Sequence, residues 1–186
     1  PYAFRYRHLP PGLQRELQAY AGEVEFVDHC IGQLIEKLKE LDIYESTLIC
    51  ITADHGDSHE EHKEIAHGYF AYNATTRVPL IFRIPNVKGG VRVEDPVSIT
   101  DIVPTICSVL GIPITEPIQG QDLGAYWTGK EDPYPGRSIF TQANDAMKYE
   151  GNSLLGIIVG DYKFIQTTRP ELYHLATDPQ ELHDIA

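Results

Sequence analysis

The amino-acid sequence predicts an α/β fold that is followed by a small antiparallel-sheet subdomain. Three patterns predict it: a long stretch with helical spacing near the start, a short apolar run at 47–53, and several β-favouring segments towards the end. The chain has 186 residues, of which 42% are hydrophobic, so it can bury a core and is the size of one ordinary domain with a small appendage. We place the boundary in the turn-rich stretch 111–137, which divides the chain into residues 1–129 and 130–186.

The first predicted element is an amphipathic helix over residues 13–41. Its apolar side chains recur at alternating steps of four and three residues, which is the spacing of one helical face. They stand at positions 13, 17, 20, 24, 27, 31, 34, 38 and 41. A coiled-coil partner helix is the alternative, but Gly12, Gly32 and the strand that follows favour packing against a sheet.

The apolar run Thr47–Ala53 is short, rich in β-favouring residues and ended by a turn, which indicates a buried central strand. Ligands of open α/β sheets bind just beyond the carboxyl ends of such strands. Asp54 and His55 occupy that place, both side chains can ligate a metal, and Gly56 permits the turn that would let them do so together. The alternative is a simple exit from the strand, in which Asp54 caps the next segment and His55 is merely exposed.

The sequence of the middle of the chain predicts a loop at the rim of the site and further elements of the sheet. The polar stretch 57–66 reads as a loop or short irregular helix, and Leu80–Ile84 as a second strand ended by Pro85. Val91–Val97 is a possible edge strand. Thr100 is a plausible N-cap for a helix that extends to about Leu110.

The last part of the chain predicts an antiparallel sheet. The segments 138–142, 154–159 and 162–166 favour strands, and Gly160-Asp161 is a tight hairpin turn between two of them. Asp178 and Pro179 suit the N-cap and first position of a short final helix.

Composition excludes some functions. The formal charge of −12 and the pI near 5.0 argue against nucleic-acid binding, since no basic stripe is present to meet phosphates. No apolar stretch approaches the ~20 residues of a membrane span. The cysteines, Cys30, Cys50 and Cys107, lie within apolar patterns and lack metal-type spacing, so we predict buried thiols. The sequence indicates no compartment.

The order of motifs around Asp54-His55-Gly56 resembles the metal-site half of the sulfatases, which belong to the alkaline phosphatase superfamily. After the polar loop come His67-Gly68 and then Arg77-Val78-Pro79 before the second strand. The resemblance extends over nearly the whole chain, through the segments 20–28, 98–106, 161–165 and 171–179. It implies that residues 1–129 are part of an alkaline-phosphatase-like sandwich, with a mixed, mainly parallel sheet and flanking helices.

The resemblance implies a divalent metal held by Asp54 and His55. Sulfatases usually hold Ca²⁺ and often have an Asp-Asn pair at these positions. The imidazole of His55 departs from that pair and is compatible with Mn²⁺ or Zn²⁺, so Ca²⁺ is the first expectation and the other two ions are alternatives.

The resemblance also implies that His67 is catalytic and binds the substrate, because sulfatases present a Lys or His to the ester oxygens at this place. A surface histidine is the alternative. Lys63 could supply a second positive charge if its loop folds inward, whereas His59 and His62 are expected to be simply solvated. Arg77 is expected to form a structural ion pair beneath the site.

Two parts of a sulfatase site are missing from this sequence. Sulfatases use a formylglycine made from Cys or Ser in a Cys/Ser-x-Pro-x-Arg motif, which occurs nowhere in the chain. The paired aspartates that complete the metal site are absent too. We therefore expect a C-terminal fragment of a sulfuric ester hydrolase, inactive alone, whose partners are the N-terminal half and a sulfate ester of a small molecule or glycan. The alternatives are a phosphatase, phosphodiesterase or phosphonate hydrolase of the same superfamily, and a non-catalytic domain with the same fold.

Overall fold

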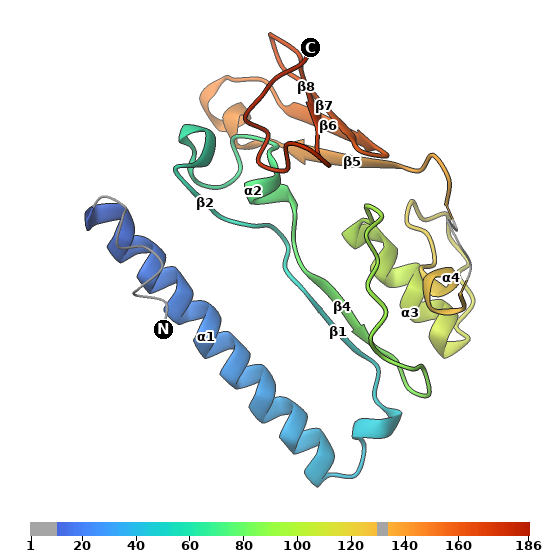
Figure 1. The fold of residues 1–186 in the computed structure, drawn as a ribbon. Helices are drawn as coiled ribbons and strands as arrows, with labels where there is room; N and C mark the ends of the chain where they lie inside the picture. The colour runs from blue at the N-terminus through green and yellow to red at the C-terminus, as the bar shows by residue number, and fades with distance from the viewer. Residues whose placement is uncertain (1–10, 130–133) are drawn as a thin grey trace.

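The computed structural model describes residues 11–129 and 134–186, and Figure 1 shows their arrangement. The first half contains α1 (Pro11–Glu40), η2 (Tyr44–Ser46), β1 (Ile49–Thr52), β2 (Ser58–His59), η3 (Glu61–Lys63), β3 (Ile65–Ala66), α2 (Asn73–Thr76) and β4 (Leu80–Arg83). The second half contains η4 (Ile99–Asp101), α3 (Ile102–Leu110), α4 (Gly124–Trp127), β5 (Ser138–Ala143), η5 (Asp145–Tyr149), β6 (Leu154–Val159), β7 (Tyr162–Gln166) and β8 (Glu171–His174). The mixed α/β class with a small antiparallel sheet is confirmed.

The long helix α1 confirms the helical spacing of the sequence. It runs diagonally along one side of the molecule and touches the rest of the chain mainly near its ends (Figure 1). Much of its apolar face is open to solvent in this chain: Val24 is 50% exposed, Val27 54% and Leu34 59%. An apolar helix face normally packs against another element, and the described residues provide no such element for this part of α1.

Strand β1 pairs with β4 in an antiparallel ladder that aligns Ile49 with Arg83 and Thr52 with Leu80. Every strand pair of residues 11–129 and 134–186 is antiparallel, so the predicted parallel strand pairs are not found among these residues. Accordingly β1 is half-buried rather than fully buried. The chain still leaves β1 at Thr52 and reaches Asp54 two residues later, as the sequence predicts.

The turn into α3 is capped two residues earlier than predicted. Ser98, and not Thr100, is the N-cap: its hydroxyl accepts from the backbone N–H of Thr100, and the Asp101 carboxylate accepts from the backbone N–H of Ser98. This capping box begins a 3₁₀ turn that continues into the helix. Asp101 is fully buried and also pairs with Arg137, the residue directly before β5.

The C-terminal sheet has four strands in the order β5-β6-β7-β8, all antiparallel. Val159 pairs with Tyr162, so Gly160 and Asp161 form the two-residue hairpin turn that the sequence predicts. The main buried cluster contains Ala143, Ile165 and Tyr173 from this sheet together with Ala71. Ala71 comes from the segment between β3 and α2, so the sheet packs directly on the segment that follows the predicted site loop.

Three predictions about local structure are wrong. Val91–Val97 is irregular, because no strand of the described residues pairs with it. The segment after Asp178 forms turns instead of a helix, since Glu181 has a left-handed φ of 57° that turns its side chain into the interior. Cys30 is exposed, and Cys50 and Cys107 are only half-buried.

Two further findings concern the organisation of the chain. None of the described helices is long and apolar enough to cross a membrane. The predicted boundary after residue 129 adjoins residues 130–133, which lie outside the described part, and it stays a prediction.

Candidate active site

Asp54 and His55 lie two and three residues beyond the end of β1, where the chain leaves the sheet. The Asp54 side chain is 88% exposed and that of His55 45%. The Nδ1 atom of His55 lies 2.8 Å from the Gly56 carbonyl, so Nδ1 carries the proton in that hydrogen bond. Nε2, which is left with its lone pair, lies 3.7 Å from Oδ2 of Asp54. The two potential ligand atoms therefore lie on the same side of the turn.

Gly56 fixes this turn by a close approach to α2. Its backbone N–H donates to the Thr75 carbonyl at 2.8 Å. A Cβ on Gly56 would lie 2.3 Å from the backbone oxygen of Ala74, well inside van der Waals contact. Only glycine allows the two segments to approach this closely, and the contact holds the Asp54-His55 turn against α2.

His67 comes from the other end of the polar loop and lies against His55. The two imidazole rings are stacked, with centroids 3.8 Å apart and planes inclined by 30°. Nδ1 of His67 donates to Oδ1 of Asp57 at 3.0 Å, which fixes the orientation of the ring. Asp54, His55, Asp57 and His67 thus form one partly exposed cluster, which we call the Asp-His cluster.

Gly68 sets the position of His67. It has a φ of 99°, which favours glycine, and a Cβ there would lie 2.8 Å from the Asp145 carboxyl carbon. Its carbonyl accepts from the backbone N–H of Asp145 at 3.0 Å. The η5 turn of the C-terminal subdomain therefore holds the chain one residue after His67.

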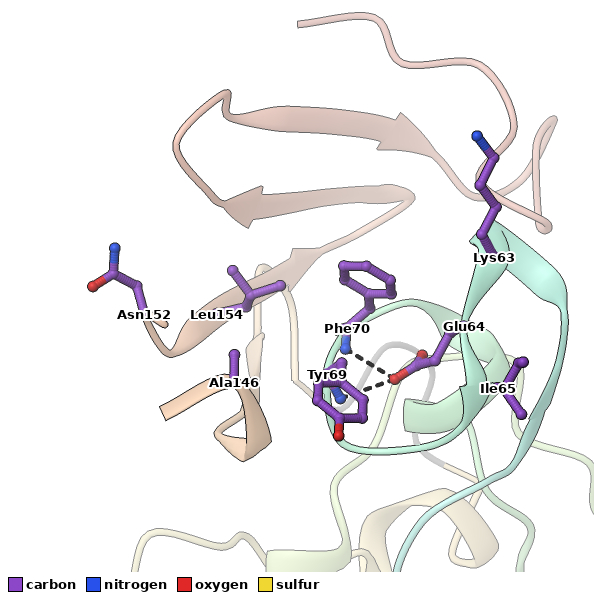
Figure 2. A pocket seen from close by; sticks show the side chains of 8 residues that line it. All are labelled: Lys63, Glu64, Ile65, Tyr69, Phe70, Ala146, Asn152 and Leu154. Atoms are coloured by element: carbon purple, nitrogen blue, oxygen red, sulfur yellow. Dashed lines mark hydrogen bonds between the residues drawn. The ribbon is translucent and has the colours of Figure 1, made fainter. Parts of the chain in front are cut away.

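The structure does not bring Lys63 to the Asp-His cluster. Its exposed side chain lines a different hollow, together with Tyr69 and Phe70, as Figure 2 shows. Asp54 and His55 line a separate, larger depression. The positive charge of Lys63 is therefore directed to another part of the surface.

The other two loop histidines are not simply solvated, contrary to the prediction. The side chain of His59 is only 10% exposed and pairs with Glu16 of α1 at 3.2 Å. His62 stacks on Tyr72 with ring centroids 3.7 Å apart, and its Nε2 donates to the Gln180 carbonyl at 2.9 Å. Both histidines fasten the loop to distant parts of the chain.

The prediction that Arg77 forms a structural ion pair is wrong for the part of the chain that the structure describes. Arg77 is exposed, and none of the ion pairs found there includes it. The buried ion pair beneath α2 comes instead from Lys163 and Glu181, whose side chains approach to 2.7 Å.

Comparison with known proteins decides the family. The model of the sulfatase family matches residues 2–112, and that of the C-terminal region of N-sulphoglucosamine sulphohydrolase matches residues 61–186. The chain belongs to the sulfatase family. The resemblance seen in the Asp-His-Gly, His-Gly and Arg-Val-Pro motifs is thereby confirmed.

Among curated relatives, human arylsulfatase K is 33% identical to this sulfatase chain over 96 residues, which are 52% of this chain and 18% of the relative. The uncharacterized sulfatase YidJ of Escherichia coli is 31% identical over 169 residues, which are 87% of this chain and 32% of the relative. The chain thus spans about a third or less of the length of these proteins.

Two solved structures show the same fold. A phosphonate monoester hydrolase of Agrobacterium radiobacter superposes with a TM-score of 0.79 at 25% identity, over 94% of this chain and 38% of its own. A 2-O GAG sulfatase superposes with a TM-score of 0.81 at 21% identity, over 99% of this chain and 41% of its own. The alkaline-phosphatase-like fold of this sulfatase chain is thereby established.

The Asp-His cluster fits a divalent metal, but only in part. Oδ2 of Asp54 and Nε2 of His55, 3.7 Å apart, have about the separation of two ligands on one ion with bonds of about 2.0–2.5 Å. Within the described residues, however, no group of three or more His, Cys, Asp or Glu side chains is placed to hold a metal. A firmly held ion in this sulfatase would need ligands from outside these residues.

Asp57 and Glu64 make structural contacts that sequence reasoning missed, because both belong to an acidic run that resembles a solvated face. Asp57 orients His67, and Glu64 is buried with 3% exposure. The Glu64 carboxylate accepts from the backbone N–H groups of Tyr69 and Phe70, at 2.9 and 3.1 Å. The only sequence signal was the position of Asp57 directly after Asp-His-Gly.

Proposed function

We propose that the Asp-His cluster is part of the active site of a metal-dependent sulfuric ester hydrolase. The observation that carries the proposal is the stack of His55 on His67, because it joins the two ends of the polar loop at a single point. This contact places an imidazole with a fixed orientation beside a pair of potential metal ligands. Membership of the sulfatase family supports the same reaction class.

In this proposal Asp54 and His55 hold the divalent cation through Oδ2 and Nε2. When bound, the cation would neutralise charge on the ester oxygens and lower the pKa of the nucleophile. Ca²⁺ is the ion expected from the family, and the imidazole of His55 keeps Mn²⁺ and Zn²⁺ as alternatives.

His67 binds the ester and assists its cleavage in this proposal. The Asp57 carboxylate accepts the Nδ1–H of His67, which leaves the Nε2 edge of the ring free, and in the imidazolium form Nε2–H would donate to an ester oxygen. With 44% of its side chain exposed, His67 can be reached by a substrate. Lys63 lines another hollow, so we propose no role for it in holding this ester.

The remaining parts of the site come, in this proposal, from polypeptide outside these 186 residues. Those parts are a formylglycine nucleophile and further metal ligands. The short span relative to the sulfatase relatives supports this view, as does the exposed apolar face of α1. The isolated 186-residue chain is therefore expected to be inactive.

The proposal is tested with the natural full-length gene product and its His67→Ala variant, assayed on 4-nitrophenyl sulfate. Loss of a charge-stabilising group at the ester should lower kcat/KM by about 10²–10³-fold. His183→Ala, which removes an imidazole that is 83% exposed near the C-terminus, is the matched control and should leave the rate unchanged. Peptide-mapping mass spectrometry of the same protein should find the formylglycine.

A second candidate function is hydrolysis of phosphonate or phosphate esters. The phosphonate monoester hydrolase of Agrobacterium radiobacter, which superposes over 94% of this chain, favours it, as does the imidazole at position 55. An unmodified Ser or Thr nucleophile together with faster turnover of phenyl phosphonate esters would select this function. Absence of any hydrolysis, with no effect of His67→Ala, would instead indicate a non-catalytic domain.

A further inference from the structure

The C-terminal sheet contains a buried ammonium group that the hydrolysis of the ester does not use. Lys163 of β7 has a side chain that is 0% exposed, and its Nζ lies 2.7 Å from Oε1 of Glu181, which is equally buried. Lysine and glutamate are almost never buried this fully unless they are paired. Because an apolar pair of similar volume often stabilises a fold as well or better, stability alone does not account for this ion pair.

Both members of the pair bind Asn73, the first residue of α2. The Lys163 ammonium donates to the amide oxygen of Asn73 at 3.1 Å, and the Glu181 carboxylate accepts the backbone N–H of Asn73 at 2.6 Å. The same ammonium donates to Oγ1 of Thr76, at the other end of this four-residue helix, at 3.4 Å. The buried pair therefore holds α2 at both ends, and this fixes where the carbonyl groups of the helix point.

The carbonyl groups of α2 meet the turn that follows β1, and the helix itself lies next to the C-terminal sheet (Figure 1). The backbone N–H of Gly56 donates to the Thr75 carbonyl at 2.8 Å. The Gly56 carbonyl in turn lies 2.8 Å from Nδ1 of His55. The contacts therefore run without a break from Lys163, through α2, to the imidazole ring of His55.

A second buried ion pair has different neighbours and provides a comparison. Arg137, the residue directly before β5, pairs with Asp101, and their side chains are 11% and 0% exposed. The Asp101 carboxylate also accepts from the backbone N–H groups of Ser98 and Gln121. None of these four residues belongs to α2 or to the turn 54–56. Breaking this pair should therefore cost stability without disturbing the turn.

We propose that Lys163 is a positioning residue of the active site, which sets the Asp54-His55 turn through Asn73 and α2. The proposal rests on the proposed function and goes beyond it, because it gives a residue of the C-terminal subdomain a part in placing groups at the end of β1. Since its side chain is 0% exposed, Lys163 acts only through its neighbours and does not reach the ester. Loss of the ammonium frees α2 and with it the turn, and a misplacement of about 1 Å at a reacting group can lower a rate by about 10²-fold.

The test is hydrogen–deuterium exchange of the full-length gene product, measured by mass spectrometry on a peptide that contains the Gly56 N–H. In Lys163→Met this amide should exchange at least about ten-fold faster than in the wild type, because its acceptor on α2 is no longer held in place. The same variant should lower kcat/KM for 4-nitrophenyl sulfate by about 10–100-fold, the loss typical of groups that orient a ligand. Arg137→Met, which breaks the comparison pair, is the matched control: it should lower stability and leave both the exchange at Gly56 and kcat/KM unchanged.

Asn73→Ala keeps the buried pair and removes only the side-chain amide that joins the ammonium to α2, so it tests the same path if Lys163→Met does not fold. It should change the exchange at Gly56 and kcat/KM in the same directions. Unchanged exchange at Gly56 in the folded variants would overturn the proposal, and so would equal acceleration in Arg137→Met, which would show an effect of stability alone. Because exchange does not depend on turnover, faster exchange at Gly56 in a protein that hydrolyses no ester would support the path from Lys163 to the turn and refute the proposed function.

Discussion

Lys163 and Glu181 form an ion pair of 2.7 Å in which both side chains are at most 1% exposed. The Lys163 ammonium also donates to the amide oxygen of Asn73 at 3.1 Å, and the Glu181 carboxylate accepts the backbone N–H of Asn73 at 2.6 Å. The pair therefore joins the C-terminal sheet and the last segment of the chain to α2. Since α2 holds Gly56, this network supports the turn that carries Asp54 and His55.

Lys163→Met should destabilise the protein by about 3–5 kcal/mol, because it leaves the charge of the buried Glu181 carboxylate without its cation. Burial lowers the pKa of Lys163, whereas the Glu181 carboxylate opposes that shift. The free energy of unfolding in urea measures the effect. The control is Lys37→Met, which removes an exposed pair on α1 and should cost less than about 0.5 kcal/mol. Similar values for the two variants would show that the buried pair has no special role.

Gly56→Ala should destabilise the protein by about 1–3 kcal/mol, because the new methyl group meets the Ala74 carbonyl. The same change should displace His55 and reduce metal binding. Gly22→Ala is the control: it lies on α1 with nothing within 4 Å of the added Cβ, and should stabilise the helix by about 0.5–1 kcal/mol. An undisturbed Gly56→Ala protein would contradict the proposed clamp between the turn and α2.

His55→Ala in the full-length protein should weaken divalent-metal binding by at least about ten-fold, the loss seen even for groups that only support a ligand. Calorimetric titrations with Ca²⁺, Mn²⁺ and Zn²⁺ measure it and rank the ions. If His55 is a ligand, the loss should be larger for Mn²⁺ or Zn²⁺ than for Ca²⁺, which prefers oxygen. Unchanged affinity for all three ions would remove His55 from the metal site.

Stability should fall with increasing pH above about 10, because of two tyrosines that share one carboxylate. The hydroxyls of Tyr72 and Tyr173 donate to Oε2 of Glu171 at 2.7 and 2.9 Å. Burial, and then these hydrogen bonds, raise the pKa of both tyrosines above the ordinary value of 10.0. The folded state therefore binds these protons more tightly, so its advantage is complete below pH 10 and is lost as the pH rises.

Tyr72→Phe tests this dependence. The variant should show a smaller decrease in the free energy of unfolding between pH 9 and 11 than the wild type, as measured by urea unfolding at each pH. Tyr162→Phe, which changes an exposed tyrosine, should keep the wild-type slope. Equal slopes for Tyr72→Phe and the wild type would assign the alkaline loss to other groups.

The sequence by itself determined the elements whose signal is local. The apolar spacing along α1, the Gly160-Asp161 turn and the Asp-His-Gly exit from β1 each depend on residues close together in the chain, so they were predicted correctly. The family motifs were local as well. Asp54, His55 and His67 could therefore be nominated, although their roles stay predictions.

The tertiary structure alone decided which of those side chains meet. The stack of His55 on His67, the contact of His59 with Glu16 and the turning inward of Glu181 towards Lys163 join residues that are 12 to 43 positions apart. The prediction of a helix after Asp178 was wrong for this reason. The pairing of Glu181 with the buried Lys163 ammonium outweighs the local preference for a helical turn. Contacts between distant residues depend on how the segments pack, and no periodicity or spacing within one segment encodes that.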